Sequence, residues 1–213
     1  MATVLYTNRC NFRCPFCHNR QLVLGQDTTL LTKEKVFEIL VSRHSFIDGV
    51  VITGGEPTIH PGLHELLASL KRTGFTLKLD TNGYRPDVLK LLLTAKVIDY
   101  VAMDIKTSWK KYNQATGVKV DIDHLVESID LIKKSDVEYE FRTTCVPSLV
   151  DSEDIEEISK LVGPSGQFTL QQFQSENTLD INYSGIIPYS RDKLINFLEI
   201  ARQHTSSCSL IGL

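Results

Sequence analysis

Three of the five cysteines fall in one short segment, Cys10-Asn-Phe-Arg-Cys14-Pro-Phe-Cys17, directly after the apolar stretch that begins at Val4. Four thiolates would complete a tetrahedral zinc site or saturate an iron–sulfur cluster. Three thiolates on one loop can instead hold a four-iron, four-sulfur cluster and leave one iron without a protein ligand. The spacing therefore indicates a metal centre with an open coordination position, where chemistry can take place.

A structural zinc knuckle is the alternative interpretation of the same segment. It needs a fourth ligand, and His18 could supply one, although its adjacency to Cys17 makes chelation by both residues awkward. The other two cysteines, Cys145 and Cys208, lie far apart in apolar stretches and are interpreted as buried packing residues. An odd number of cysteines with three crowded together argues against a disulfide framework and favours a reducing, cytoplasmic compartment.

Length and composition place the chain among ordinary globular proteins. Its 213 residues suffice for one well-buried domain, and we expect a single domain over residues 1–213. A hydrophobic content of 42% and a charged content of 23% are typical of soluble proteins. The net charge of −3 gives no reason to expect a nucleic-acid partner. No apolar run is long enough to cross a membrane, and the N-terminus lacks a signal-peptide pattern.

Short runs rich in branched and aromatic residues alternate with segments of helical period, which predicts a parallel sheet with right-handed crossovers. The predicted strands are Thr3–Thr7, Val50–Thr53, Phe75–Asp80, Tyr100–Ile105, Val137–Val146 and Gln167–Phe173, with a seventh at Cys208–Ile211. Between them, Pro86 suits a first helical turn, Gly163 a helix end and Ser190 an N-cap.

Two predicted strands carry apolar side chains on one face and charged side chains on the other. In residues 75–80, Leu77 and Leu79 oppose Lys78 and Asp80, and residues 137–142 alternate in the same way. Parallel strands covered on both faces usually read as apolar throughout. A curved sheet with helices outside and a polar lumen explains the pattern better than a flat sheet with one wet face. Six strand–helix units are fewer than the eight of a closed barrel, so we predict an α/β fold that forms a partial (β/α)6 TIM-type barrel.

Polar motifs follow the predicted strands at their C-terminal ends, the face where barrel enzymes keep their chemistry. They are Gly54-Gly55-Glu56-Pro57-Thr58, Asp80-Thr81-Asn82-Gly83, Met103-Asp104-Ile105-Lys106, Arg142-Thr143-Thr144 and Gln171-Gln172-Phe173-Gln174. Simpler interpretations stay open. The first two motifs could be ordinary turns, and Asp104 could form a structural ion pair with Lys78 or Arg142.

The C-x3-C-x2-C segment, together with Gly54-Gly55-Glu56-Pro57, resembles the signature of the radical S-adenosylmethionine (SAM) superfamily. The continuation Cys17-His18-Asn19 is similar to that of glycyl-radical-enzyme activases. Further similarity extends over nearly the whole chain, through Leu77–Gly83, Asp99–Lys106, Tyr139–Thr144 and Leu170–Phe173. Taken together, these segments resemble the compact activating proteins of anaerobic ribonucleoside-triphosphate reductase.

This resemblance implies a set of cofactors and ligand residues. Cys10, Cys14 and Cys17, on a cluster loop at residues 8–20, would hold a [4Fe–4S] cluster to which SAM binds. A monovalent cation is implied beside the SAM carboxylate, between Asp80 and Asp104. Phe16 would pack on adenine or simply anchor the loop. The residues expected to contact the cofactors are Phe16, Gly54, Gly55, Glu56, Asp80, Thr81, Asp104, Lys106, Arg142 and Gln174.

The resemblance also implies an activity. The reduced cluster would cleave SAM to methionine and a 5′-deoxyadenosyl radical, which abstracts hydrogen from a glycine of anaerobic ribonucleoside-triphosphate reductase. Reduced flavodoxin or ferredoxin would donate the electron, and no protein acid or base is needed. Two alternatives remain open. One is another radical SAM enzyme, such as a pyruvate formate-lyase-type activase or an enzyme acting on a small molecule or peptide. The other is a non-catalytic iron–sulfur protein.

Overall fold

The computed structural model describes residues 1–26, 30–164 and 166–213. The chain packs as two compact units, each considered by itself below. Unit 1 comprises Met1–Asn11, Gln21–Ala102 and Asp123–Glu138, and unit 2 comprises Phe12–Arg20, Met103–Ile122 and Tyr139–Leu213. In the described part of the chain, no helix combines the length and the apolar character required to cross a lipid bilayer.

Seven strands form one sheet in their order along the chain. They are β1 (Ala2–Thr7), β2 (Gly49–Gly54), β3 (Thr76–Thr81), β4 (Tyr100–Asp104), β5 (Glu138–Cys145), β6 (Gln167–Gln172) and β7 (Ser207–Ile211). In unit 1, β1 pairs in parallel with β2, and β2 with β3. In unit 2, β5 pairs in parallel with β6, and β6 with β7. Each predicted strand end lies within one residue of the observed end, and the sheet is open because β1 and β7 terminate the strand order.

The helices of unit 1 bury one face each. They are α2 (Lys33–Ser42), α3 (Leu63–Arg72), α4 (Pro86–Thr94) and α6 (Ile122–Lys134), with the short helix η1 (Pro57–Ile59) after β2 and α1 (Arg20–Leu24) after the cysteine segment. Leu67 and Leu70 of α3 are fully buried, as are Leu77 and Leu79 of β3, against which α3 packs. Pro86 occupies the first turn of α4, as predicted, where its missing N–H is not needed.

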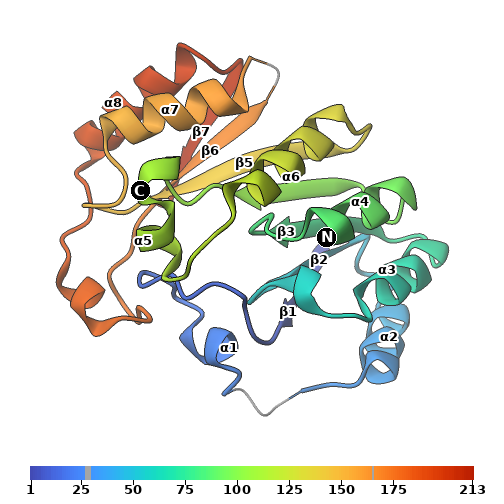
Figure 1. The fold of residues 1–213 in the computed structure, drawn as a ribbon. Helices are drawn as coiled ribbons and strands as arrows, with labels where there is room; N and C mark the ends of the chain where they lie inside the picture. The colour runs from blue at the N-terminus through green and yellow to red at the C-terminus, as the bar shows by residue number, and fades with distance from the viewer. Residues whose placement is uncertain (27–29, 165) are drawn as a thin grey trace. The chain divides into compact units, whose positions relative to one another are not determined.

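In unit 2, the long helices α7 (Ser152–Val162) and α8 (Arg191–Arg202) lie side by side and contact β6 (Figure 1). Asp151 begins α7 with a reciprocal capping box, and Gly163 ends it. Ser190 caps α8 through its hydroxyl, as predicted. The remaining helices of this unit are short: η2 (Trp109–Lys111), α5 (Tyr112–Thr116) and η3 (Ile181–Gly185).

The two faces of the strands differ as expected in β3, where Leu77 and Leu79 are buried and Lys78 and Asp80 are half-buried. They differ less clearly in β5, where Glu140 is buried and Tyr139 is half-buried. In β5, Phe141 and Thr143 are buried, whereas Arg142 and Thr144 on the opposite face are half-buried. Cys145 is buried, as predicted, and burial raises the pKa of its thiol to about 12, so the thiol is neutral at physiological pH. Cys208 is only half-buried, because it lies on β7 at the edge of the sheet.

Candidate cofactor site at the strand ends

In unit 1, the turn after β2 lies directly against the start of the cysteine loop. The backbone N–H of Gly55 donates to the carbonyl of Thr7 at 2.8 Å, and that of Glu56 donates to the carbonyl of Arg9 at 2.9 Å. A Cβ atom on Gly55 would lie 1.8 Å from the Arg9 oxygen. Gly54 has φ +116° and equally little space, since its Cβ would lie 2.4 Å from the Thr7 nitrogen. Only glycine permits this approach of two backbones.

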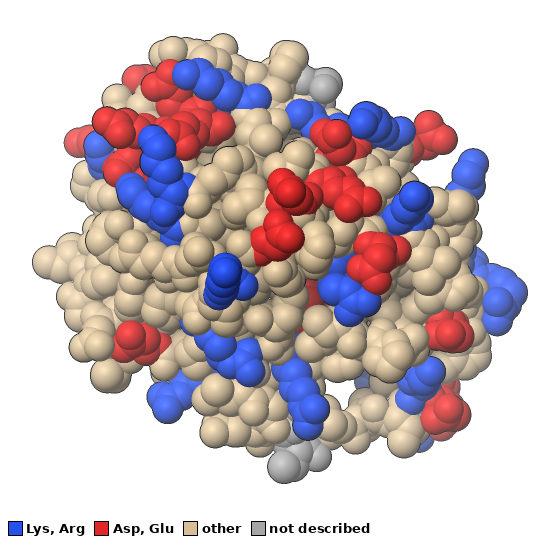
Figure 2. Space-filling view, viewed as in Figure 1, with Lys and Arg blue, Asp and Glu red and all other residues tan. Residues whose placement is uncertain are grey.

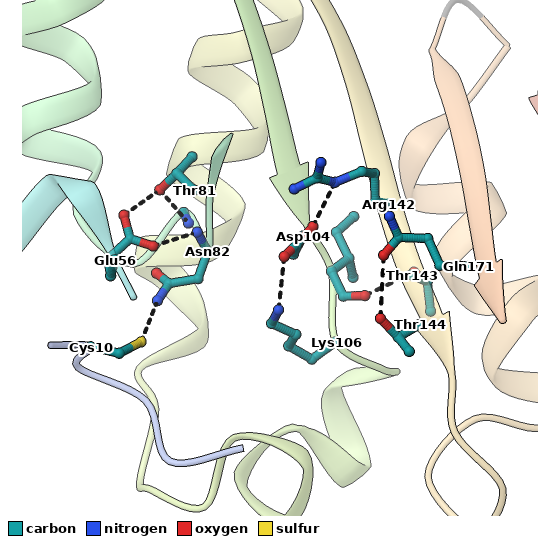
Figure 3. Close-up of polar contacts among 12 residues, drawn as sticks. Cys10, Glu56, Thr81, Asn82, Asp104, Lys106, Arg142, Thr143, Thr144 and Gln171 are labelled. Atoms are coloured by element: carbon teal, nitrogen blue, oxygen red, sulfur yellow. Dashed lines mark hydrogen bonds and ion pairs between the residues drawn. The ribbon is translucent and has the colours of Figure 1, made fainter. Parts of the chain in front are cut away.

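Glu56 joins the end of β2 to the end of β3 (Figure 3). Its Oε1 accepts hydrogen bonds from the hydroxyl of Thr58 at 2.6 Å and the hydroxyl of Thr81 at 2.7 Å. Its Oε2 accepts the backbone N–H of Asn82 at 2.7 Å. Burial raises the pKa of the carboxyl group, and these hydrogen bonds oppose that rise. The carboxylate is therefore a structural brace, and its contact with SAM stays a prediction.

Asn82 connects this brace to the first cysteine. Its side-chain Nδ2 donates to Oδ1 of Asn11 at 2.8 Å and lies 3.8 Å from the sulfur of Cys10 (Figure 3). The Nδ2 atom of Asn11 is buried with no hydrogen-bond partner in the described structure. His60 contacts the carbonyl of Asn8, with its Nε2 2.7 Å from that oxygen. Cys10 thus lies beside one side-chain amide donor, Nδ2 of Asn82, and its own sulfur lies 3.7 Å from the acceptor Oδ1 of Asn11.

In unit 2, the rest of the cysteine loop is fastened on two sides. The N–H of Arg13 donates to the carbonyl of Thr116 at 2.7 Å, and the carbonyl of Pro15 accepts the N–H of Asp180 at 2.9 Å. The N–H of Cys17 donates to the carbonyl of Cys14 at 3.0 Å, which turns the loop between these cysteines. Nδ1 of His18 lies 2.9 Å from the carbonyl of Glu176, a contact that gives this histidine a loop-anchoring position. Phe16 is buried within the loop.

Asp104 lies between two cations at the end of β4. Its Oδ1 accepts a hydrogen bond from Nε of Arg142 at 2.8 Å, and its Oδ2 accepts one from Nζ of Lys106 at 2.9 Å (Figure 3). Burial alone would raise the pKa of Asp104, but Arg142 and Lys106 overcome this effect and hold the pKa at about 2. Burial would likewise lower the pKa of the Lys106 ammonium group, but the charges of Asp104 and then of Cys14 raise it overall. The backbone N–H of Lys106 donates to the buried hydroxyl of Tyr112 at 3.4 Å.

The ion pair of Asp104 with Arg142, considered from the sequence as a structural alternative, is therefore present. Two cations share one carboxylate, so the cluster carries a net positive charge that suits a carboxylate ligand. Binding of the SAM carboxylate here stays a prediction.

We expect Asp104→Asn to lower the free energy of unfolding by about 2 kcal/mol at pH 7, since a shift of one pKa unit is worth about 1.4 kcal/mol. The folded pKa lies below the unfolded value of 3.8. The contribution is therefore complete above the unfolded pKa and is lost as pH falls towards the folded pKa. Urea denaturation at pH 7 and pH 3 would show the difference between wild type and variant shrinking by about 1 kcal/mol. The exposed Asp136→Asn serves as the control, and a pH-independent difference would contradict the assignment.

The other predicted residues have different surroundings. In unit 1, Oδ1 of Asp80 lies 3.8 Å from Nζ of Lys78, and the hydroxyl of Thr81 donates a hydrogen bond to Glu56. In unit 2, Gln174 is exposed, whereas the neighbouring Gln171 accepts a hydrogen bond from Thr144 at 3.4 Å. The cation site of Asp80 and Asp104 stays a prediction. Sequence reasoning gave no individual role to Asn82, His60 or Tyr112. The partners of Asn82 and His60 are distant along the chain, and Tyr112 begins the short helix α5, which has no helical period to detect.

The donor set of the cysteine loop, three thiols, is one that an iron–sulfur cluster can use. Cys10, Cys14 and Cys17 lie on one loop, and none of them forms a disulfide bond. Over residues 1–26, 30–164 and 166–213, no three His, Cys, Asp or Glu side chains lie close enough together to hold one metal ion. A structural zinc ion requires four ligands at one point, whereas each iron of a cluster takes a single thiolate.

Comparison with known proteins agrees with this chemistry. The family model of the radical SAM superfamily matches residues 4–162. The chain belongs to the radical SAM superfamily, a class that implies a [4Fe–4S] cluster and SAM as cofactors. The predicted superfamily and the predicted open parallel sheet are both confirmed.

Its similarity to individual proteins is more specific. The chain is 34% identical over 208 residues to the "Putative glycyl-radical enzyme activating enzyme MJ1227" of Methanocaldococcus jannaschii, covering 95% of this chain and 85% of that protein. A second protein of that organism, the "Putative glycyl-radical enzyme activating enzyme MJ1632", is 29% identical over 221 residues, covering 97% of this chain and 80% of the relative.

Solved structures share the fold. The Streptococcus suis protein SuiB, bound to its precursor peptide SuiA, superimposes with a TM-score of 0.78 at 16% identity. The match covers 99% of this chain and 48% of SuiB, so the chain spans about half the length of that protein. TYW1 with a lysine-pyruvate adduct matches with a TM-score of 0.67 at 16% identity, covering 96% of this chain and 74% of TYW1.

Proposed function

We propose that this chain activates a glycyl-radical enzyme by generating a glycyl radical on it. The observation that carries the proposal is the 34% identity to a named activating enzyme over 95% of the chain. The three-cysteine loop provides the chemistry that such an activity needs. The bound cluster and SAM would supply the reductive cleavage that yields a 5′-deoxyadenosyl radical, and the protein binds, orients and shields these groups.

The residues at the strand ends divide this work. Cys10, Cys14 and Cys17 would hold the cluster, and the bare backbone of Gly54 and Gly55 would accept the SAM amino end. The cluster of Asp104, Lys106 and Arg142 offers charge-assisted donors for a carboxylate. Phe16 and Gln174 would border the adenosine. Asp80 and Asp104 are the residues that the resemblance implies for the cation, and Thr81 would be a further cofactor contact. No side chain is required to move a proton.

Anaerobic ribonucleoside-triphosphate reductase is the target that we propose, with reduced flavodoxin or ferredoxin as electron donor in the cytoplasm. The segments Leu77–Gly83, Asp99–Lys106, Tyr139–Thr144 and Leu170–Phe173, which together resemble the activating proteins of this reductase, favour the target. A pyruvate formate-lyase-type activase is the runner-up. An enzyme that modifies a peptide is a further alternative, because the fold is shared with SuiB, whose structure holds a precursor peptide.

The test is electron paramagnetic resonance of the partner. The reconstituted protein, dithionite and SAM are incubated without oxygen with purified anaerobic ribonucleoside-triphosphate reductase. We expect a glycyl-radical doublet on the reductase, and no doublet when the C-terminal radical-site glycine of the reductase is replaced by alanine. SAM cleavage without any doublet on the reductase would reject this target and favour the runner-up. The same incubation with pyruvate formate-lyase then tests that alternative directly.

A further inference from the structure

A buried side-chain amide beside the first cysteine of the loop carries a donor that no described residue uses. Over residues 1–26, 30–164 and 166–213, Nδ2 of Asn11 has no hydrogen-bond partner, although the atom is buried. Asn11 directly follows Cys10, and its Oδ1 lies 3.7 Å from the Cys10 sulfur. Nearly all buried polar groups in folded proteins have a partner, because a buried donor without one costs free energy. The amide of Asn11 is therefore suited to a ligand that accepts a hydrogen bond next to Cys10.

The orientation of this amide is fixed by hydrogen bonds from the turn after β3, which belongs to the same unit. Oδ1 of Asn82 accepts the backbone N–H of Tyr84 at 3.0 Å, so the other end of the Asn82 amide, Nδ2, is the end that faces Asn11. This Nδ2 donates to Oδ1 of Asn11 at 2.8 Å. If the Asn11 amide were turned over, two NH₂ groups would face each other and the hydrogen bond would be lost. The donor end of Asn11 is therefore the end that is available to a ligand.

Sulfur is the acceptor that this position fits best. Each iron of a cluster is bound by one cysteine thiolate and by inorganic sulfides, so a donor beside Cys10 has sulfur atoms in its surroundings. Nδ2 of Asn82 already lies 3.8 Å from the Cys10 sulfur (Figure 3), which shows that amide nitrogen approaches sulfur here. The amino end of SAM is itself a donor when it is protonated and does not match a second donor.

We propose that Nδ2 of Asn11 donates a hydrogen bond to a sulfur atom of the [4Fe–4S] cluster and thereby raises the reduction potential of the cluster. Reduction adds one electron and makes the sulfur atoms more negative, so an N–H group directed at sulfur stabilises the reduced cluster more than the oxidised one. Asn82 holds the other end of the amide. This role requires the cluster of the superfamily and no particular partner, so it goes beyond the proposed function and is tested separately from it.

The test is the reduction potential of the reconstituted cluster, measured without SAM by a redox titration that electron paramagnetic resonance follows. Asn11→Leu removes the donor at similar size, and Asn11→Asp removes it but retains an acceptor for Asn82. We expect both variants to disfavour the reduced cluster about tenfold, which is a shift of about 59 mV towards negative potentials for one electron. Unchanged potentials in both variants would overturn the proposal. Unchanged potentials with weaker binding of SAM would assign the donor to SAM and overturn it as well.

The exposed Asn196→Asp on α8 is the matched control, because it makes the same chemical change away from the cysteine segment. Over the place of α7 and α8, Figure 2 shows basic side chains beside acidic ones, and salt screens such surface charges. We expect this variant to have the potential of wild type. A shift as large as that of Asn11→Asp would attribute the effect to net charge and overturn the proposal.

A second measurement uses the wild-type protein and does not depend on stable variants. Asparagine labelled with ¹⁵N in its side-chain amide is incorporated, and electron–nuclear double resonance detects the nitrogen atoms coupled to the reduced cluster. We expect couplings from two amide nitrogens, those of Asn82 and Asn11. A single coupling would show that Asn82 alone contacts sulfur and would overturn the proposal. If the Asn11 variants bind less iron than wild type, this count decides the outcome. The absence of a glycyl radical on any partner would change neither readout.

Discussion

Gly55→Ala is expected to abolish cluster assembly while leaving most of the fold intact. The new Cβ atom would lie 1.8 Å from the carbonyl oxygen of Arg9, so the backbone of the cysteine loop would have to move. That movement breaks the hydrogen bond from the N–H of Glu56 to the Arg9 carbonyl and displaces Cys10, the next residue. Overpacking of this kind costs about 3 kcal/mol. Iron and sulfide content after anaerobic reconstitution, and absorbance of the cluster, measure the effect.

Gly185→Ala is the matched control for this variant. Its Cβ atom would meet nothing within 4 Å, and its backbone does not need glycine. We expect it to bind as much iron as wild type. Circular dichroism of both apo-proteins separates loss of the cluster from loss of the fold. A Gly55→Ala protein that holds a full complement of iron would show that the loop does not depend on the turn after β2.

Glu56→Ala is expected to be the most destabilising substitution among the polar residues of the site. It leaves the hydroxyls of Thr58 and Thr81 and the N–H of Asn82 buried without their acceptor. Each buried donor without a partner costs about 1–3 kcal/mol, so we expect a loss of about 4 kcal/mol in the free energy of unfolding. Glu56→Gln retains one acceptor oxygen and should lose about 2 kcal/mol. Urea denaturation of the apo-proteins measures both values.

The exposed Glu127→Ala on α6 is the control, with an expected change below about 0.5 kcal/mol. The order of the variants is as informative as the values. If Glu56→Gln were as stable as wild type, the carboxylate would not be the brace between β2 and β3. A cluster lost in Glu56→Ala but retained in Glu56→Gln would show that the brace also holds the turn that contacts the cysteine loop.

The strands could be predicted because local composition determines them. Runs of branched and aromatic residues, such as those of β2 and β5, predict strands with little help from the rest of the chain. Caps such as Gly163 and Ser190 were equally local. The short helices η2 and α5 were missed, since three to five residues provide no helical period to detect. Burial of Tyr112 and the contact of Thr116 with Arg13 stabilise that segment, and both depend on residues far along the chain.

In the site, too, the features that belong to one segment could be predicted, whereas those that depend on distant residues could not. The cysteine spacing and the motifs at the strand ends were visible in the sequence, because each belongs to one continuous segment. The hydrogen bonds that the Glu56 carboxylate accepts from Thr58, Thr81 and Asn82 could not be predicted, because they depend on how the ends of β2 and β3 align. The two cations that share Asp104 were individually noted, but their joint effect on its pKa needed the distances.

The central claim, that the three-cysteine loop supports reductive cleavage of SAM, is tested most directly by one anaerobic assay. Wild type, Cys14→Ala and the distant Cys208→Ala are reconstituted with iron and sulfide, then given dithionite and SAM, and 5′-deoxyadenosine is quantified by chromatography. The account predicts 5′-deoxyadenosine from wild type and Cys208→Ala and none from Cys14→Ala. A wild-type protein that binds one zinc ion in place of iron, or that forms the cluster without cleaving SAM, would contradict it.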